Sequence, residues 1–506
     1  MREKKTDPEL PVLLPFTPGQ ASNGEFVPRA PTRQHLAAEA LAFEMAEDIA
    51  HRRGLDRRRF LMGVGGIAVT LTAINLVGCD SKDKKTLPPG VTAGATYDVP
   101  SDADPGACAK LSGDEFIFDV QTHHVDPQGP WVNESPATAN FFRAFRPDCT
   151  EADKLDCLSR YYYAHDIFLE SDTSIAVLSD TPSASDTSDP LNFDDMKRTR
   201  DILNDLSPKD SGRLRLHSVV VPNVGPVEAQ LDRMQARAVA MDVAAWKIYT
   251  PYGPGNTGWF LDDPVLGIPI IEQARKLGVK TICAHKGLPL FGFDVAHASP
   301  RDIGVVAKAY PDVNFVVYHS GWYPGTREGP YDPANADRGV NSLVKSLLDN
   351  GVQPNSNVYA EMGSTWRNIM SDTTQAAHLV GKLLKYVGVD NLLWGTDCIW
   401  TGSPQPQIVA FRAFNMDAQF AQQYGYPLPT ADVKRKVFGL NAARLYGVDP
   451  VEAKCKVAQD EVERLRNASA EMQMDTHEVR YTPRGPISRR GMLEWFRQHG
   501  GRWQLG

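Results

Sequence analysis

Short apolar runs rich in β-branched residues recur from residue 114 onwards, and polar residues gather where the runs end. The first run, residues 116–118, is followed by Asp119, Gln121, His123 and His124. Side chains alternate along a strand, so Asp119, Gln121 and His123 are expected on one face. Two ligands two residues apart at the end of a strand can reach one metal ion. The plain alternative is a buried strand whose histidines find hydrogen bonds.

The stretch from residue 114 to residue 450 alternates between strand patterns and helix patterns. Eight candidate strands in this length predict a (β/α)8 TIM barrel, an α/β fold. An open doubly wound sheet competes, but it needs fewer strands, and no glycine-rich phosphate loop follows the first strand. The other seven strands are expected at residues 174–179, 214–221, 243–249, 279–285, 313–319, 357–362 and 391–397. Helices are expected at residues 227–240, 269–277, 303–310, 376–386 and 433–446.

The segments that flank this region have a different composition. Residues 1–56 form a polar N-terminal extension, which we expect to be poorly ordered apart from a short helix over residues 35–50. Residues 80–113 are charged and rich in turn residues, which is typical of a linker. Residues 451–506 predict a helix followed by a basic end.

Residues 57–79 combine a cationic start with an apolar stretch that is too short and too polar for a membrane span. Arg57-Arg58-x-Phe60-Leu61 resembles a twin-arginine export signal, and Leu76-Val-Gly-Cys79 resembles a lipobox, in which Cys79 is lipidated after cleavage. Together they predict export to the periplasm or the cell surface, with membrane contact only through the signal or the lipid. A buried amphipathic helix in a cytoplasmic protein is the alternative. A start at Met45 would shorten the leader to an ordinary length.

The composition is ordinary for a soluble globular protein, with 42% hydrophobic and 23% charged residues. A net charge of -8 argues against a nucleic-acid partner. None of the seven cysteines is spaced C-x-x-C, which argues against a thiolate zinc site. Cys149 and Cys157 are close in a loop-like region, where export would allow a disulfide between them, and two unpaired thiols are the alternative.

Polar residues fall at the ends of several predicted strands. In barrels the loops at the carboxyl ends of the strands carry the chemistry. Histidines or carboxylates at four strand ends are costly as core packing, so we expect a functional site there rather than a hydrogen-bonded polar plug. The residues are Gln121 and His123 on the first strand, Lys247 on the fourth, His285 on the fifth, His319 on the sixth, Glu361 on the seventh and Asp397 on the eighth.

These residues and their order resemble the amidohydrolase superfamily, in the amidohydrolase-related branch that includes aminocarboxymuconate-semialdehyde decarboxylase. Asp119-Val-Gln-Thr-His123 occupies the place of the family's first-strand motif. His285 and His319 match its histidines on strands five and six, and Asp397 matches its aspartate on strand eight. The resemblance covers residues 114–450 and implies one divalent metal ion, usually zinc, at the barrel mouth.

The resemblance also implies roles for these residues. His123, His285 and Asp397 would hold the metal, and Asp397 would take a proton from a metal-activated water and return it to the leaving group. His319 would polarise a substrate carbonyl or stabilise the transition state. Gln121 departs from the family, because it stands where the first histidine is usual. It is a weak fourth ligand, or it orients a water or the substrate, or the site has lost its metal.

Lys247, Trp322 and Glu361 are expected to contact the substrate. In two-metal members of the superfamily a carboxylated lysine on strand four bridges the ions, but that site needs the histidine that Gln121 replaces. Lys247 therefore binds a substrate carboxylate or phenolate, or it pairs with Glu361. Aromatic residues near the strand ends, such as Trp322 and Trp400, suit a ring-shaped or apolar small molecule, although loop packing also explains them.

Three functions follow from these patterns. The first is a metal-dependent hydrolase of a carbon–nitrogen, lactone or ester bond, which export mildly favours. The second is a metal-dependent non-oxidative decarboxylase of an aromatic or unsaturated carboxylic acid. The third is a non-catalytic binding lipoprotein with a degenerate site. The patterns leave assembly into a homo-oligomer open.

Overall fold

The structure is a computed structural model, and its described residues contain a parallel eight-stranded barrel. Each strand pairs with the next in chain order, and the last returns to the first. Asp397 donates its backbone N–H to the carbonyl of Gln121 at 2.8 Å, and Thr122 bridges Cys398, which closes the barrel. The described residues are 13–21, 28–54, 57–61, 63–79, 94–99, 111, 113–146, 149, 151–185, 187–206, 212–289, 293–325 and 327–471. The barrel strands are β2 Phe118–Thr122, β3 Ile175–Leu178, β4 Leu214–Val220, β5 Val243–Tyr249, β6 Thr281–His285, β7 Asn314–Tyr318, β8 Val358–Glu361 and β9 Leu392–Leu393.

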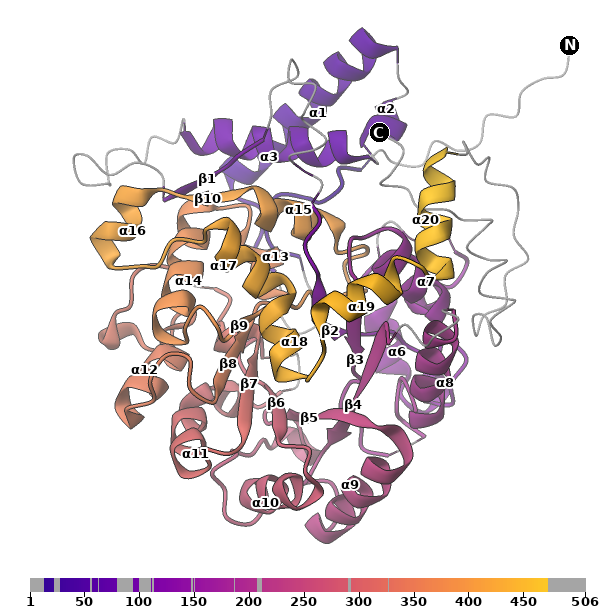
Figure 1. Ribbon diagram of the computed structural model, residues 1–506, viewed down its shortest axis with the longest axis vertical. Coiled ribbons are helices and arrows are strands. Elements are labelled where there is room, and N and C mark those ends of the chain that lie inside the picture. The colour runs from indigo at the N-terminus through magenta and orange to yellow at the C-terminus, as the bar shows by residue number, and fades with distance from the viewer. Residues whose placement is uncertain are drawn as a thin grey trace, which may run out of the picture.

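Helices surround the barrel, as expected for a TIM barrel (Figure 1). The predicted barrel fold is confirmed, and each predicted helix has a counterpart. The barrel-region helices are α5 Trp131–Glu134, α6 Pro136–Phe142, α7 Arg160–Ala164, α8 Phe193–Asn204, α9 Val227–Met241, α10 Gly267–Leu277, α11 Ile303–Ala309, α12 Asn341–Asn350, α13 Thr365–Ile369, α14 Thr373–Tyr386, α15 Gln405–Ala413, α16 Ala418–Tyr424, α17 Ala431–Arg435, α18 Asn441–Leu445, α19 Pro450–Val457 and α20 Glu461–Glu471. Short 3-10 turns are η2 Lys154–Leu158, η4 Pro254–Asn256, η5 Val295–Ala298, η6 Pro300–Asp302, η7 His319–Gly321 and η8 Pro333–Asn335, and η3 His165–Leu169 and η9 Lys436–Leu440 are π-helical.

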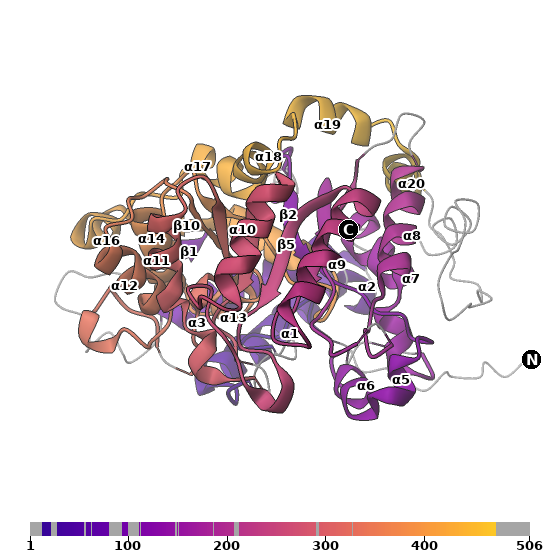
Figure 2. The same cartoon turned by 90° about the horizontal axis from the view of Figure 1, so that it is seen from below.

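The core forms two layers because alternate side chains of each strand point to opposite sides of the sheet. Phe118, Val120 and Val177 belong to a cluster inside the barrel, and Ala442 and Ala443 of α18 join it. The larger cluster lies between the strands and the surrounding helices. α18 and α19 lie at one end of the barrel, and α5 and α6 lie at the other (Figure 2). The segment around α18 therefore covers the amino-terminal end of the strands and leaves the carboxyl end for the site.

The N-terminal region is more structured than its composition predicts. α1 (Arg33–Arg53) and α3 (Val64–Cys79) pack against each other, with α2 (Arg57–Leu61) beside them, and residues 13–21 are placed as well. The expectation of poor order was therefore wrong for the described part of residues 1–56. The polar composition hid a stripe of small and apolar side chains on α1, which is buried against α3. This stripe consists of Ala42, Ala46 and Ile49.

α3 is also attached to the barrel domain. Ile67, Leu71 and Ile74 join the main core, and the Asn75 amide exchanges hydrogen bonds of 2.7 and 2.8 Å with the backbone of Tyr97. Tyr97 lies on β1 (Ala95–Tyr97), which pairs with β10 (Phe414–Met416). No helix in the described part of the chain has both the length and the apolar character to cross a membrane. Export and lipidation remain predictions, and the side chain of Cys79 lies outside what the structure describes.

Cys149 and Cys157 form a disulfide bond, which decides between the two alternatives left by the sequence. The bond joins Cys149, in the loop after α6, to Cys157 of η2. Among the described cysteines with placed side chains, Cys283, Cys398 and Cys455 are free thiols.

Candidate active site at the barrel mouth

The strand-end residues predicted from the sequence converge at the carboxyl end of the barrel. Gln121, Lys247, His285 and Glu361 lie on strands, His319 directly follows β7, and Asp397 lies in the segment after β9. These six residues and His123 are buried, with exposed fractions of 3% or less. His124 points elsewhere and contacts the hydroxyl of Thr199 at 3.0 Å, as the alternation along the strand predicts.

Backbone carbonyls orient all three imidazoles. His123 donates from Nδ1 to Ser179 O at 2.8 Å, and His319 donates from Nδ1 to Gly363 O at 2.8 Å. His285 donates from Nε2 to Leu288 O at 3.2 Å. A carbonyl only accepts, so the proton of each neutral ring is on the nitrogen that faces the carbonyl. The other nitrogen of each ring keeps a lone pair, which is how metal-binding histidines are held.

Burial keeps two of these rings neutral. It lowers the pKa of His319 to about 4, with Asp397 acting in the opposite direction. Burial likewise lowers the pKa of His285 well below its ordinary value, and the charges of His319 and Lys247 lower it further. Both rings therefore have the lone pair that a ligand or proton acceptor needs at neutral pH.

Asp397 is ionised and held by several donors. Its Oδ1 lies 2.9 Å from Gln121 Nε2 and 3.1 Å from His123 Nε2, and its Oδ2 accepts from the Ser364 hydroxyl at 2.6 Å. Burial alone would raise the pKa of Asp397. The contacts with His123 and His319 and the hydrogen bond from the Ser364 hydroxyl outweigh that effect and hold the pKa below its ordinary value.

Gln121 occupies the centre of the site. Its Nε2 lies 3.5 Å from His123 Nε2 and 3.4 Å from His319 Nε2, in addition to the bond to Asp397. Its Oε1 is buried and has no hydrogen-bond partner. A Cβ at position 363 would lie 2.6 Å from this oxygen, so Gly363 is the residue that makes room for the Gln121 amide.

The backbone around the site is strained. Among the described residues, eight non-glycine residues have a positive φ, and five of them adjoin this site. Such conformations cost on the order of 1–3 kcal/mol each and persist only where the surroundings hold them, typically at functional sites. The five residues are Leu288, His319, Ser320, Ser364 and Asp397.

Comparison with known proteins identifies the family. The model of the family described as amidohydrolase matches residues 171–448, more than half of the chain. The chain belongs to this family. Membership makes it an enzyme of the amidohydrolase superfamily, whose members depend on a divalent metal. A search of the curated proteins finds no match.

Solved structures also resemble the chain, at low identity. An uncharacterised TIM-barrel protein from Bordetella bronchiseptica is 13% identical over 67% of this chain and 99% of its own, with a TM-score of 0.42. A 5-carboxyvanillate decarboxylase from Novosphingobium aromaticivorans, solved with bound manganese, is 14% identical over 66% and 98%, with a TM-score of 0.41. A 2,6-dihydroxybenzoate decarboxylase from Rhizobium is 16% identical over 66% and 99%, with a TM-score of 0.39. Likeness at this level does not bear on the reaction.

The donor set fits the divalent metal of an amidohydrolase. His123 Nε2 and Asp397 Oδ1 lie 3.1 Å apart, although the Ser179 carbonyl directs the proton of a neutral His123 to the other nitrogen. Two ligand atoms about 2.1 Å from one zinc ion would lie about 3.0–3.4 Å apart, which matches this separation. A cation between His123 Nε2 and Asp397 Oδ1 would also remove the repulsion between the lone pairs of these two atoms. The unsatisfied Oε1 of Gln121 is a further oxygen donor beside them. Imidazole and carboxylate together suit zinc.

His285 stands further from this pair. Among the described residues, one group of three histidine, cysteine or acidic side chains has all its ligand atoms within 4.8 Å of one another, and it is His165, Asp166 and Glu170. The expected ligands His123, His285 and Asp397 are thus more widely spread. The His285 ring lies 4.7 Å, centroid to centroid, from the His319 ring. His123 and Asp397 are therefore the best-placed ligands, and the assignment of His285 remains a prediction.

The buried group around His165 has a structural explanation. His165 lies between Asp166 Oδ1 at 2.9 Å and Glu170 Oε1 at 3.2 Å, and Arg146 contacts Asp166 at 2.9 Å. The arginine forms an ion pair with one carboxylate and the histidine contacts both, which is a sufficient reason for the cluster. Arg146 also donates to the carbonyl of Cys157, so the network anchors the disulfide loop.

Glu361 differs from Asp397 in protonation. Burial raises the pKa of Glu361 to about 8, and the negative charge of Asp397 adds to this. Its carboxyl group accepts from the backbone N–H groups of His319, at 3.0 Å, and Gly363. Two neighbouring carboxyl groups with pKa values pushed apart are the usual arrangement of an acid and a base.

Lys247 is a buried cation set among aromatic rings. Its Nζ lies 3.5 Å from the centroid of the Tyr318 ring and 4.9 Å from that of Tyr249. Its charge lowers the pKa of Glu361 and of the neighbouring His217. The expected role in substrate binding stays a prediction. The neighbouring Lys286 is instead paired with buried Asp302, at 2.8 Å.

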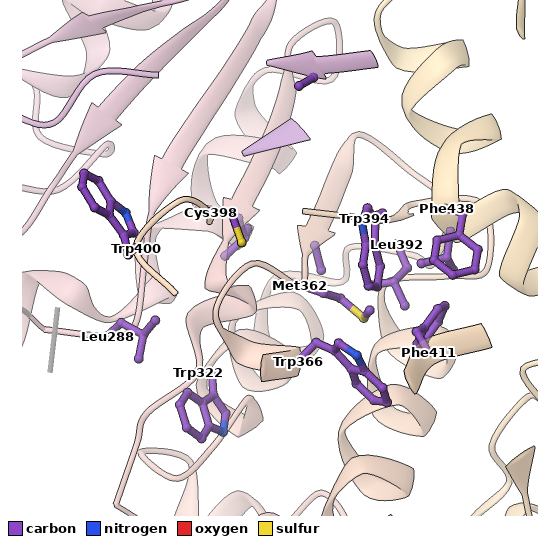
Figure 3. Close-up of a cluster of buried hydrophobic side chains, with 14 of the residues drawn as sticks. Leu288, Trp322, Met362, Trp366, Leu392, Trp394, Cys398, Trp400, Phe411 and Phe438 are labelled. Atoms are coloured by element: carbon purple, nitrogen blue, oxygen red, sulfur yellow. The ribbon is translucent and has the colours of Figure 1, made fainter. Parts of the chain in front are cut away.

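Aromatic side chains form the wall of the site. Trp400 stacks on His123 with ring centroids 5.4 Å apart and on Phe142 at 5.0 Å, and Tyr249 stacks on His285 at 5.2 Å. Figure 3 places Trp400 and Cys398 on the chain that follows β9. Trp322, the expected substrate contact, is buried and follows the short turn η7 that begins at His319. Flat, apolar ring faces therefore pack beside the polar and charged groups at the centre of the site.

Sequence reasoning missed three residues of the site. Ser364 bonds Asp397, Ser179 fixes the tautomer of His123, and Gly363 admits the Gln121 amide. Ser179 is the last residue of the predicted strand 174–179 and Ser364 lies shortly after the predicted strand 357–362, so both stand near strand ends, where polar residues signal a site. Asp119 shares a strand face with Gln121 by alternation, yet its carboxylate accepts from the backbone of Thr396 at 3.0 Å and acts in closing the barrel.

Proposed function

We propose that the protein is a metal-dependent, non-oxidative decarboxylase of a small aromatic carboxylic acid. The observation that carries this proposal is the closure of the site, in which seven charged or polar side chains have exposed fractions of 3% or less and aromatic rings pack against two of them. Loss of carbon dioxide spreads a localised carboxylate charge, so a water-poor site favours the transition state over the bound acid. Hydrolysis, in contrast, needs water as a second substrate.

The residues support this chemistry in distinct ways. A divalent ion, for which we propose zinc, would supply Lewis acidity and would be held by His123, Asp397, Gln121 and His285. Lys247 would bind the carboxylate or phenolate of the acid through its buried charge. His319 would orient the acid beside Asp397, and Glu361 holds a proton at neutral pH because burial raises its pKa. Trp400 and Tyr249 would pack against an aromatic ring.

A second candidate is hydrolysis of a carbon–nitrogen, lactone or ester bond. The ionised state of Asp397 favours it, because a carboxylate next to a metal can accept a proton from water. The non-catalytic alternative would apply if the site had lost its metal.

One experiment separates these functions. The purified protein is analysed for metal, loaded with zinc or manganese, and incubated with a panel of hydroxybenzoates and with a panel of lactones, esters and amides. Carbon dioxide release from an aromatic acid supports the proposal, and turnover of the second panel alone supports hydrolysis. Failure to bind either metal would contradict both enzymatic functions.

We also propose that the protein is exported. The Arg57-Arg58 pattern supports this, and so does the Cys149–Cys157 disulfide, since such bonds persist in oxidising compartments. Cell fractionation of the native host is the test, and a purely cytoplasmic protein with free thiols at both positions would contradict it.

A further inference from the structure

Residues 13–21 lie along the helix that follows β8 at the barrel mouth. The backbone N–H of Gly19 donates to the Ser371 hydroxyl at 3.0 Å, and that of Ala21 donates to Asn368 Oδ1 at 2.9 Å. Asn368 belongs to α13, which begins one residue after Ser364. The N-terminal segment is thereby attached to the loop that contributes Ser364 to the site.

A buried arginine makes the same attachment. The Arg367 guanidinium donates to the carbonyls of Gly19 at 3.0 Å and Thr17 at 3.2 Å, and it lies 5.8 Å from the centre of the Phe16 ring. Burial lowers the pKa of Arg367 to about 10. The acceptors of this buried cation thus come from the N-terminal segment, and their loss would leave a costly buried charge on α13.

Asn368 links the segment to the predicted metal ligand. Its Oδ1 accepts from Ala21, and its Nδ2 donates to the carbonyl of Ser364 at 2.7 Å. Ser364 in turn donates from its hydroxyl to Asp397 Oδ2 at 2.6 Å. Ser364 has a φ of 55°, which an L-residue adopts only when its surroundings hold it there. Three hydrogen bonds therefore connect the N-terminal segment to Asp397.

We infer that residues 13–21 are a permanent part of the active site, in which Asn368 is the positioning residue that keeps Ser364 on Asp397. The inference rests on the role proposed for Asp397. It implies that the N-terminal region stays attached to the mature barrel, with α1 and α3 packed beside it. Any cleavage within residues 57–79, including the one before Cys79 that lipidation requires, would remove the segment. The export proposed above is therefore compatible with this inference only if the signal is not cleaved.

A double-mutant cycle tests the connection. Ala21→Pro removes the N–H that binds Asn368, and Ser364→Ala removes the bond to Asp397. If the segment acts through Ser364, Ala21→Pro should weaken zinc binding about tenfold in the wild-type background and less than twofold in the Ser364→Ala background. Ser371→Ala is the matched control, because it also loses one bond to the segment but lies outside the path to Asp397. Its zinc affinity should equal that of the wild type.

A second variant and a second measurement cover the cases in which Ala21→Pro fails to fold or the protein binds no metal. Asn368→Leu keeps the N-terminal backbone intact, and it should reproduce the loss of affinity if Ala21→Pro fails to fold. The same cycle is measured by urea unfolding, which needs no metal, so an inactive or metal-free protein would contradict the proposed function while the coupling remains measurable. Additive effects of the Ala21 and Ser364 substitutions in both measurements would overturn the inference. So would a native protein that starts at Cys79 and binds zinc as tightly as the full chain.

Discussion

The replacement Gln121→His tests whether the central amide faces a metal ion. In the structure Gln121 Nε2 donates to Asp397 Oδ1 at 2.9 Å and competes with a metal for that oxygen. The substitution removes this competitor and adds an imidazole, a better zinc ligand than a neutral amide. Structural zinc sites with four ligands bind with about 10–16 kcal/mol, or roughly 3 kcal/mol for each ligand. After allowance for imperfect geometry, we expect zinc to bind about 10–100-fold more tightly.

The assay is competition with a chromophoric chelator at fixed pH and ionic strength. Gln121→Leu is the paired variant, and it should weaken zinc binding about tenfold if the amide oxygen is a ligand. His124→Gln is the matched control, because this buried neighbour contacts Thr199 rather than the site and should leave the affinity unchanged.

A Gln121→His variant that binds zinc no more tightly than the wild type would show that the side chain at position 121 does not face the metal ion. Equal weakening by histidine and leucine would show that Gln121 only orients Asp397. A change in the His124→Gln control would show instead that the first strand tolerates no substitution, and that the affinities report damage to the barrel.

Three further predictions concern catalysis, the disulfide and pH. Asp397→Asn should lower kcat by roughly 10²–10⁴-fold with an unchanged circular dichroism spectrum, and retained turnover would assign the base elsewhere. Serine at both Cys149 and Cys157, which are separated by 8 positions, should lower the free energy of unfolding by about 2–3 kcal/mol, and a wild-type protein indifferent to reductant would contradict this. Burial raises the pKa of both Asp180 and Asp189 beside a cavity of about 40 Å³, and contact with Asp189 raises that of Asp180 further. The folded state therefore binds more protons than the unfolded state and loses stability as pH rises from about 3.8 through the raised values. Asp189→Asn should flatten this dependence in urea unfolding from pH 4 to 8, and an unchanged slope would refute it.

The barrel was predictable because each strand is a short apolar run with a polar end. Strands buried on both sides lack the polar alternation of surface strands, and the turn residues between helices and strands mark their limits. The length of β9 was not predictable: residues 391–397 were expected as a strand, and the ladder contains only Leu392–Leu393. Asp397 has a φ of 60°, so this predicted site residue lies outside the extended conformation that the sequence pattern assigned to it.

The N-terminal region shows where composition misleads. α1 has many charged residues, and its partner α3 resembles an export signal, so the sequence offers no local reason for either helix to join the fold. α3 is held by contacts outside the helix pair, such as Asn75 with Tyr97, and residues 13–21 are held by contacts far along the chain, such as Gly19 with Ser371. Such contacts carry no periodicity that a sequence pattern can show.

The sequence by itself determined the barrel and the residue types at its mouth, because strand periodicity is local and the carboxyl ends of parallel strands meet at one face. It also identified Gln121 as the departure from the family. Only the tertiary structure placed the Gln121 amide between His123, His319 and Asp397, and only it linked Ser364 and the N-terminal segment to that carboxylate. The physical reason is that hydrogen-bond partners from distant segments depend on the closed fold, in which side-chain directions and burial are fixed together.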